Sequence, residues 1–203
     1  MIIEIVSWIA VALILLTSTI MLINRDWRIS LGSLALQYAA AFFLVTRHLP
    51  FVMGSAKLIT GWMVVAALGM TRLAFSAADD DKEELSLLHG AWFRMILMCI
   101  VALVAFGATT RIEAVIPGLG LPVIAGSLLL IGAGVAHLGV TSDLLRVILG
   151  LLTMLTGFEI LYSAVESSIL VAGFLSVISL GLGLVGSYLL LAGSASSETE
   201  NEL

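Results

Sequence analysis

Residues 118–138 read GLGLPVIAGSLLLIGAGVAHL and contain no Asp, Glu, Lys or Arg. A transmembrane helix needs about 20 consecutive, predominantly apolar residues. This stretch is therefore long and apolar enough to cross a bilayer. Six further stretches have the same character, and together they predict spans at residues 2–24, 29–46, 50–71, 91–110, 118–138, 143–165 and 168–192. Because the first of these lacks a preceding basic region and a small-residue cleavage site, we expect a retained helix and not a cleaved signal.

The composition of the chain leads to the same fold class. Of its 203 residues, 61% are hydrophobic and 11% are charged, and the mean hydropathy is +1.17. A soluble domain carries roughly 25% charged residues, so in water this chain would expose large apolar patches. This excludes a soluble enzyme and a disordered regulator, and the net charge of −5 argues against a nucleic-acid binder. The predicted fold is all-α: a polytopic transmembrane helical bundle of about seven spans, forming a single domain over 1–193, with a disordered tail over 194–203.

Several residues between and within the spans have simple interpretations. Residues 79–84 read DDDKEE; we interpret them as a solvated acidic loop, with a metal site as the weaker alternative. Cys99 is the single cysteine and lies in an apolar run, so we expect a buried small side chain and no disulfide framework. The glycines at 181, 183 and 186 lie inside a span and indicate close helix packing, not a nucleotide-binding fingerprint.

The distribution of Lys and Arg predicts the orientation of the bundle. Cytoplasmic loops of membrane proteins carry an excess of these residues, and Asp and Glu contribute little to the rule. One side of the predicted bundle has six of them near span ends, and the other has only Arg47 and Arg111. We therefore expect the N-terminus outside, and the C-terminus and the acidic loop inside.

Two ionisable residues lie well inside predicted spans, where a charge costs several kcal/mol. Lys57 is about 10 Å from the start of the third span at 1.5 Å per residue. Glu159 lies at a similar depth in the sixth span. An ion pair between them, direct or through water, is possible if the two helices touch.

Each of the two also has an interpretation without a role in transport. Lys57 can extend its long stem towards the interface. Glu159 can be protonated and hydrogen-bonded, holding helices together. The functional alternative is that Glu159 loads and releases protons under the influence of a nearby cation. Tyr162, Ser163 and Glu166 follow at helical spacing on the same face and can carry water outward, although Glu166 is expected to be an ordinary interfacial carboxylate.

Three polar residues near other span positions complete the candidate set. His137 can relay protons near neutral pH, but an interfacial histidine with a backbone partner is the simpler interpretation. Asp143 is placed to cap the sixth span and to pair with Arg146. Gln37 lies near the middle of the second span, where an amide is expected to hydrogen-bond neighbouring helices. The sequence shows no catalytic pair, cysteine cluster or phosphate loop, so we expect no catalytic residues, no cofactor and no bound metal.

Short motifs in three of the spans share a pattern found in a known group of proteins. Residues 143–150 read DLLRVILG and lead into a span that holds Gly157 and Glu159; residues 28–32 read RISLG, and residues 55–60 read SAKLIT. This pattern resembles the hydrogenase-4 component E subunits. It resembles more distantly the small K subunit (chain 4L) of respiratory complex I and the C subunit of Mrp antiporters. Seven spans suit component E, and the K-like part would be residues 118–192.

The resemblance has specific implications and specific departures. It implies a multi-pass subunit in the inner (cytoplasmic) membrane of a prokaryote, with antiporter-like integral membrane subunits as partners. Asp143 stands where the relatives carry Asn, and their membrane glutamates fall on Leu152 or Leu155 and near Val177. Glu159 lies one to two turns beyond the first of these positions. It can substitute for that carboxyl, but a two-glutamate relay is not expected.

The leading hypothesis is therefore a non-redox membrane subunit of a complex related to complex I, a membrane hydrogenase or a Mrp-type antiporter. It would contribute to proton or sodium translocation, with Glu159 as the loading carboxyl and Lys57 as the residue that tunes or relays it. Tyr162 and His137 are the further pathway candidates. Two alternatives stay open: an autonomous small transporter or channel, and a purely structural assembly subunit whose two charges lock helices together.

Overall fold

The computed structural model describes the backbone of residues 2–24, 26–75, 87–166 and 168–201, and the side chains of most of them. Within these ranges the chain forms seven helices and no strand. They are α1 (Ile2–Ile23), α2 (Trp27–Val45), α3 (Phe51–Phe75), α4 (Leu87–Val115), α5 (Leu121–Val140), α6 (Leu144–Val165) and α7 (Ile169–Asn201). The all-α fold class is confirmed.

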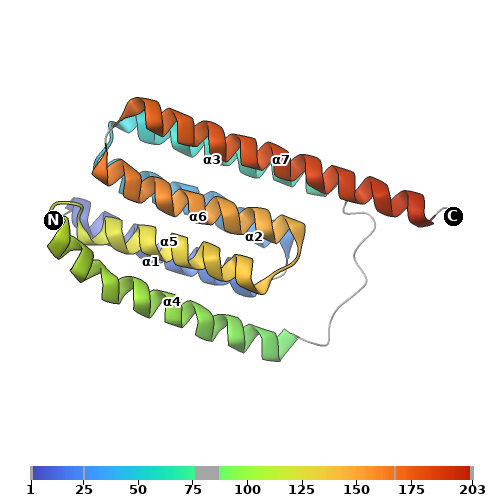
Figure 1. Ribbon diagram of the computed structural model, residues 1–203, viewed down its shortest axis with the longest axis horizontal. Coiled ribbons are helices and arrows are strands. Elements are labelled where there is room, and N and C mark those ends of the chain that lie inside the picture. Colours follow the sequence, from blue (N-terminus) through green and yellow to red (C-terminus); the bar gives the residue numbers. More distant parts are fainter. Residues whose placement is uncertain (1, 25, 76–86, 167, 202–203) are drawn as a thin grey trace.

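The seven helices coincide with the seven predicted spans, and each is long and apolar enough to cross a membrane. Figure 1 shows the two termini at opposite ends of the bundle, as an odd number of spans requires. Which terminus faces the cytoplasm stays a prediction. The acidic residues 79–84 lie outside the described residues. The backbone of α7 continues as helix to Asn201, beyond the predicted end of the last span, and the disorder expected over 194–203 stays a prediction.

The helices are arranged as three two-helix layers with α4 against the last of them. The layers are α3 with α7, α2 with α6, and α1 with α5, and α4 packs on α5 and α1 (Figure 1). Because α2 and α6 lie in the middle layer, they bury a large share of their side chains, whereas α4 buries little. The helices with the largest buried share are therefore α5, α2 and α6.

Glycines set the closest approach in the bundle, which is between α5 and α6. A Cβ atom on Gly157 would lie 2.7 Å from the backbone oxygen of Ser127, and one on Gly134 would lie 2.7 Å from the backbone oxygen of Gly150. The two backbones therefore touch without intervening side chains. The close packing predicted for the glycines of α7 is confirmed at Gly183 and Gly186, which face Val64 and Ile148, whereas Gly181 borders open space.

Cys99 is a correction to the sequence analysis. The apolar surroundings of this residue predicted a buried side chain, but Cys99 is exposed on α4. The prediction was wrong because an apolar run in a membrane helix does not distinguish the side that faces other helices from the side that faces the exterior. On α4, most positions face the exterior.

The helix ends at the side of the bundle where α1 begins are joined by short turns, and we refer to this side as the Ile2 end. Residues 46–50 connect α2 to α3 there, and residues 116–120 connect α4 to α5. Gly118 and Gly120 adopt positive φ angles of 98° and 87°, which L-residues with side chains rarely adopt. Both of their backbone N–H groups donate to the carboxylate of Glu113, at 3.2 and 3.1 Å, and this fixes the turn.

Candidate functional site

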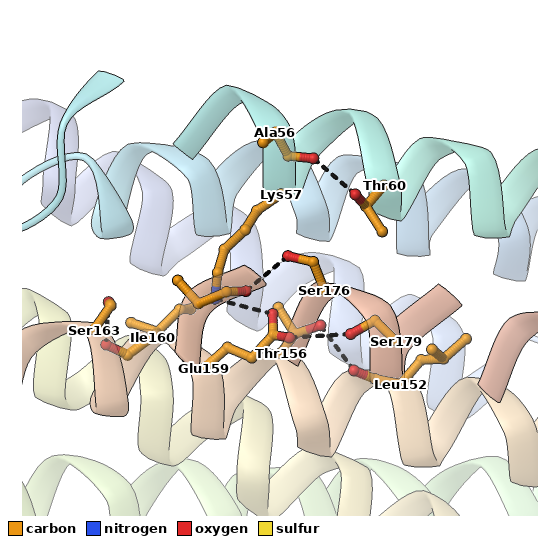
Figure 2. A network of polar contacts seen from close by, with 11 residues as sticks. Ala56, Lys57, Thr60, Leu152, Thr156, Glu159, Ile160, Ser163, Ser176 and Ser179 are labelled. Carbon is orange, nitrogen blue, oxygen red and sulfur yellow. Dashed lines mark hydrogen bonds and ion pairs between the residues drawn. The ribbon is translucent and has the colours of Figure 1, made fainter. Parts of the chain in front are cut away.

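An ion pair joins α3 to α6 inside the bundle. The Nζ atom of Lys57 lies 3.4 Å from Oε2 of Glu159, and the two side chains are only 10% and 7% exposed. Figure 2 shows the stem of Lys57 extending from α3 towards the carboxylate. Lys57 therefore points into the protein and not out along its stem towards the interface. The structure brings together the two ionisable residues that the sequence analysis placed at a similar depth.

The ion pair bridges two helices whose backbones are not in direct contact. Among the described helices, α3 packs against α2 and α7 but not against α6, and α6 packs against α2, α5 and α7. The four helices α2, α3, α6 and α7 thus surround the pair. Since a lysine stem has four methylene groups, Lys57 can reach across the interval that separates the two backbones.

A serine from a third helix completes the surroundings of the carboxylate. The Oγ atom of Ser179, on α7, donates a hydrogen bond of 3.0 Å to Oε1 of Glu159. Each carboxylate oxygen thus has one partner, the ammonium group on Oε2 and the hydroxyl on Oε1. A buried carboxylate needs such partners because desolvation is costly. Figure 2 shows the three side chains converging from three helices.

A small cavity lies beside the ion pair. Its volume is about 10 Å³, and its polar lining comes from Tyr38, Lys57, Thr156 and Glu159. A volume of this size is at the lower limit for one water molecule. The Tyr38 hydroxyl is buried and makes no hydrogen bond within the described part of the chain. The cavity therefore places a buried phenol hydroxyl next to the charged pair.

The position of Tyr38 depends on a glycine of the neighbouring helix. A Cβ atom on Gly61, in α3, would overlap the ring of Tyr38. The ring therefore packs directly on the α3 backbone, one turn after Lys57. This contact orients the hydroxyl of Tyr38 towards the same cavity as Lys57 and Glu159.

A second polar cluster lies further along α6, away from the Ile2 end. Nε2 of Gln37 donates to the Oγ of Ser18 at 2.7 Å, and the Oγ1 of Thr153 donates to Oε1 of Gln37 at 3.2 Å. Gln37 is 1% exposed, and these bonds join α1, α2 and α6. The expectation that Gln37 hydrogen-bonds neighbouring helices is confirmed.

The two clusters lie along one line of buried polar side chains on α6. The line, which we call the polar stripe of α6, consists of Arg146, Thr153, Thr156, Glu159 and Ser163, all of them buried. Successive members are three, four or seven residues apart, the spacing that keeps side chains on one side of a helix. At 1.5 Å per residue the stripe covers about 25 Å, close to the thickness of the hydrocarbon core. It therefore extends through most of the apolar depth of the bundle.

His137 lies near the other end of this stripe and not beside Glu159. It is 3% exposed and lies against Gly150, about 13 Å along α6 from Glu159. The Nε2 atom of His137 is buried and has no hydrogen-bond partner among the described residues. The interpretation of an interfacial histidine with a backbone partner stays a prediction.

The two contacts predicted for Asp143, a helix cap and an ion pair with Arg146, differ from expectation in the first turn of α6. Asp143 occupies the N-cap position, but its side chain makes no capping hydrogen bond. Its Oδ2 lies 4.0 Å from Nε of Arg146, at the limit of an ion pair. Arg146 instead donates to the backbone oxygen of Asn24 at 2.9 Å, which ties α6 to the end of α1.

The residues that follow Glu159 on α6 separate onto two sides of the helix. Ser163 is buried and donates to the backbone oxygen of Ile160 at 2.7 Å. The ring of Tyr162 lies 6.1 Å from the ring of Phe158, which is 47% exposed, so Tyr162 lies near the edge of the bundle. Glu166 is exposed, as expected. Of these three, Ser163 alone shares the buried side with Glu159.

Four polar residues of the site were not identified from the sequence. They are Ser18, Thr153, Thr156 and Ser179. The positions of Thr153 and Thr156, six and three residues before Glu159, place both on its side of the helix, so spacing alone would have found them. Ser179 has no such signal because it comes from a different helix that contains several serines.

Comparison with known proteins finds no family model, no curated protein and no solved structure that matches this chain. The chemistry of the site is therefore argued from its own residues. A buried carboxylate, an ammonium group, a phenol and several hydroxyls can together bind a proton or a small cation and pass it along a short distance.

Proposed function

We propose that this chain is a non-redox membrane subunit that takes part in proton or sodium translocation and packs beside other integral membrane subunits. The observation that carries the proposal is the buried Lys57–Glu159 pair, set within the polar stripe of α6. Ionisable residues inside membrane segments are costly to bury and commonly mark ion pathways. The parent assembly that the sequence motifs favour is one related to complex I, a membrane hydrogenase or a Mrp-type antiporter.

The chemistry of the pair follows from its burial. As a pair, Lys57 and Glu159 are neutral overall, and breaking such a pair leaves one unpaired charge at a cost of several kcal/mol. A proton that loads onto Glu159 removes the partner of the ammonium group. Loading is therefore coupled to Lys57, which either releases a proton or moves its flexible stem to another partner. In this mechanism Glu159 is the loading site and Lys57 controls when it is filled.

The neighbouring polar groups can pass a proton or an ion along α6 on both sides of the Lys57–Glu159 pair. Tyr38 and Thr156 line the cavity next to Glu159, and the cluster of Gln37 and Thr153 lies further along the stripe. Ser163 lies on the side towards the Ile2 end. Hydroxyl groups both donate and accept hydrogen bonds, so they suit proton transfer with water and also offer oxygen ligands to a sodium ion.

The distribution of the apolar surface supports lateral partners. The outermost helices α3, α4 and α7 bury 22%, 11% and 28% of their most apolar stretches within the chain. The chain has little mass outside the seven helices. A partner that acts with it therefore has to be met mainly inside the bilayer. Large integral membrane subunits fit this requirement.

The first test identifies the assembly. A tagged copy is purified from its own membranes in a mild detergent, and the proteins that copurify are identified by mass spectrometry. We expect antiporter-like integral membrane subunits together with iron–sulfur subunits. Isolation of the chain as a homo-oligomer alone would overturn the assignment to a multi-subunit complex.

The second test addresses ion translocation. In membrane vesicles that contain the intact assembly, Glu159→Gln is expected to reduce coupled ion pumping at least ten-fold while the amount of assembled complex stays the same. Glu166→Gln is the matched control, because it removes an exposed carboxylate from the end of the same helix. Normal pumping by an assembled Glu159→Gln variant would refute the proposal.

A purely structural role is the second candidate, and one observation favours it. Lys57, Glu159 and Ser179 join α3, α6 and α7 at one point, and α3 and α6 have no other direct packing in the described structure. A role in holding these three helices together requires only this geometry. Replacement of both charges by a neutral polar pair, Lys57→Gln with Glu159→Gln, separates the two candidates. Pumping that survives in the assembled double variant supports the structural role, and pumping that is lost supports translocation.

A further inference from the structure

A pocket that lies outside the polar stripe opens at the Ile2 end of the bundle, between the start of α1 and the end of α2. Its volume is about 510 Å³, and its lining consists of Ile3, Val6, Ser7, Phe43, Thr46 and Arg47. This volume lies within the range of small-molecule sites, about 300–1,000 Å³. The lining combines one cation and two hydroxyls with three apolar side chains, so the ligand that it suits is amphipathic.

The guanidinium of Arg47 is held in place but uses little of its hydrogen-bonding capacity. Its Nη1 donates to the Oγ of Ser7 at 3.3 Å. Its Cζ and both Nη atoms would lie 3.9 Å from a Cβ on Gly120, so the group rests beside the backbone of the turn before α5. An arginine has five N–H donors, and among the described residues Arg47 forms one side-chain hydrogen bond and no ion pair.

Two described carboxylates of the same region form no ion pair with this cation. Glu113 directs its two oxygens to the backbone N–H groups of Gly118 and Gly120. Glu4 is exposed on α1, one turn before Ser7, and forms no ion pair with Arg47 in the described structure. Among the described residues, Arg47 therefore lies next to the apolar wall of the pocket without an ion pair.

The position of the pocket in the fold defines the kind of anion that it meets. Arg47 belongs to the turn between two membrane-spanning helices, where the hydrocarbon layer gives way to the headgroups. Ile3 and Phe43 are 69% and 48% exposed, so the apolar wall is accessible from the exterior of the bundle. At this depth an acyl chain and a phosphate group occur next to each other in one molecule.

We propose that this pocket binds a phospholipid, with its phosphate on Arg47 and the upper part of an acyl chain along Ile3, Val6 and Phe43. The planar fork of a guanidinium matches two phosphate oxygens. The hydroxyls of Ser7 and Thr46 already donate to the backbone oxygens of Ile3 and Phe43, so Arg47 supplies the donors for the phosphate. The apolar wall excludes water from one side of the phosphate. This site is separate from the Lys57–Glu159 pair, and the proposal does not depend on ion translocation.

The test measures lipid binding to the full chain, or to its assembly, in a neutral detergent. Native mass spectrometry gives the dissociation constant for the first bound phosphatidylglycerol, and diacylglycerol with the same chains reports the contribution of the phosphate. We expect phosphatidylglycerol to bind at least ten-fold more tightly than diacylglycerol. Arg47→Gln is expected to weaken phosphatidylglycerol binding about ten-fold, the loss that corresponds to one hydrogen bond to a charged group.

The matched control is Arg111→Gln, which removes an exposed arginine from α4 near the same end of the bundle and outside the pocket. This control is expected to leave binding unchanged. Val6→Trp fills the pocket while keeping Arg47 and is expected to weaken binding as well, which covers the case in which Arg47→Gln fails to fold. Equal losses in Arg47→Gln and Arg111→Gln, or equal binding of diacylglycerol, would overturn the proposal. Displacement of the lipid by an equal concentration of inorganic phosphate would identify a free-anion site and overturn the lipid assignment.

Discussion

Lys57 and Glu159 form an ion pair between two helices whose backbones do not touch, with Nζ 3.4 Å from Oε2. The pair is buried, and its attraction acts in a medium of low dielectric constant, where two charges at this separation interact far more strongly than in water. Both charges also lose their hydration, which costs several kcal/mol for each ion. The net contribution of the pair is therefore smaller than the cost of removing one of its members.

This imbalance gives the first prediction. Lys57→Met leaves the Glu159 carboxylate without its cation and is expected to lower the free energy of unfolding by about 3–5 kcal/mol, and Glu159→Leu by a similar amount. The double variant Lys57→Met with Glu159→Leu is expected to recover most of that loss, since neither charge is then left unpaired. Unfolding in mixed micelles by titration with sodium dodecyl sulfate measures all three. Additive losses in the double variant would mean that the two side chains do not interact.

The helices of this fold were predictable from the sequence because the bilayer imposes a length on them. Seven apolar stretches of about 20 residues were enough to predict α1 to α7, and most of the predicted helix ends lie within a few residues of the observed ones. The arrangement of the helices was not predictable in the same way. Apolar side chains that face lipid and apolar side chains that face other helices have the same composition, as Cys99 on α4 illustrates.

The two charged residues at the centre of the site were predictable from the sequence, whereas the residues around them were not. Charges inside spans are rare, so Lys57 and Glu159 stood out, and their similar depth made a pair possible. Their actual contact depends on which helices are neighbours, which the sequence does not specify. Ser179 reaches Glu159 from α7, and the unbonded hydroxyl of Tyr38 follows from its packing on Gly61. Each of these depends on helix packing.

The second prediction concerns the hydrogen bonds of Gln37. Gln37→Leu removes the bonds to Ser18 and Thr153. Each is expected to cost about 0.6 kcal/mol, the average for bonds between membrane helices, and at most about 1.7 kcal/mol. Thr19→Val is the control, because the hydroxyl of Thr19 bonds to the Leu15 carbonyl of its own helix. The same unfolding titration compares the two. A loss for Gln37→Leu no larger than that of the control would show that the cluster does not stabilise the bundle.

The third prediction concerns the contact between α5 and α6. Gly157→Ala places a methyl group 2.7 Å from the backbone oxygen of Ser127, so the two helices have to move apart. We expect a loss of about 1–3 kcal/mol, typical of overpacking. Gly181→Ala is the matched substitution in open space, where the higher helix propensity of alanine is expected to stabilise α7 by up to about 1 kcal/mol. Opposite shifts of the two thermal unfolding temperatures in detergent would support the contact, and parallel shifts would contradict it.

The last prediction uses the hydroxyl of Tyr38, which is buried without a hydrogen bond to any described residue. An unpaired buried polar group carries a desolvation cost of about 1–3 kcal/mol, so Tyr38→Phe is expected to leave the free energy of unfolding unchanged or to raise it. If the cavity beside Glu159 holds a water molecule bonded to this hydroxyl, the substitution removes that bond and stability falls instead. Tyr162→Phe deletes the same group from a ring at the edge of the bundle and serves as the reference.

Ion pumping by the assembled Tyr38→Phe variant then separates function from stability. A reduced rate at undiminished stability is expected if the hydroxyl transfers protons to the Lys57–Glu159 pair, and an unchanged rate would remove Tyr38 from the pathway.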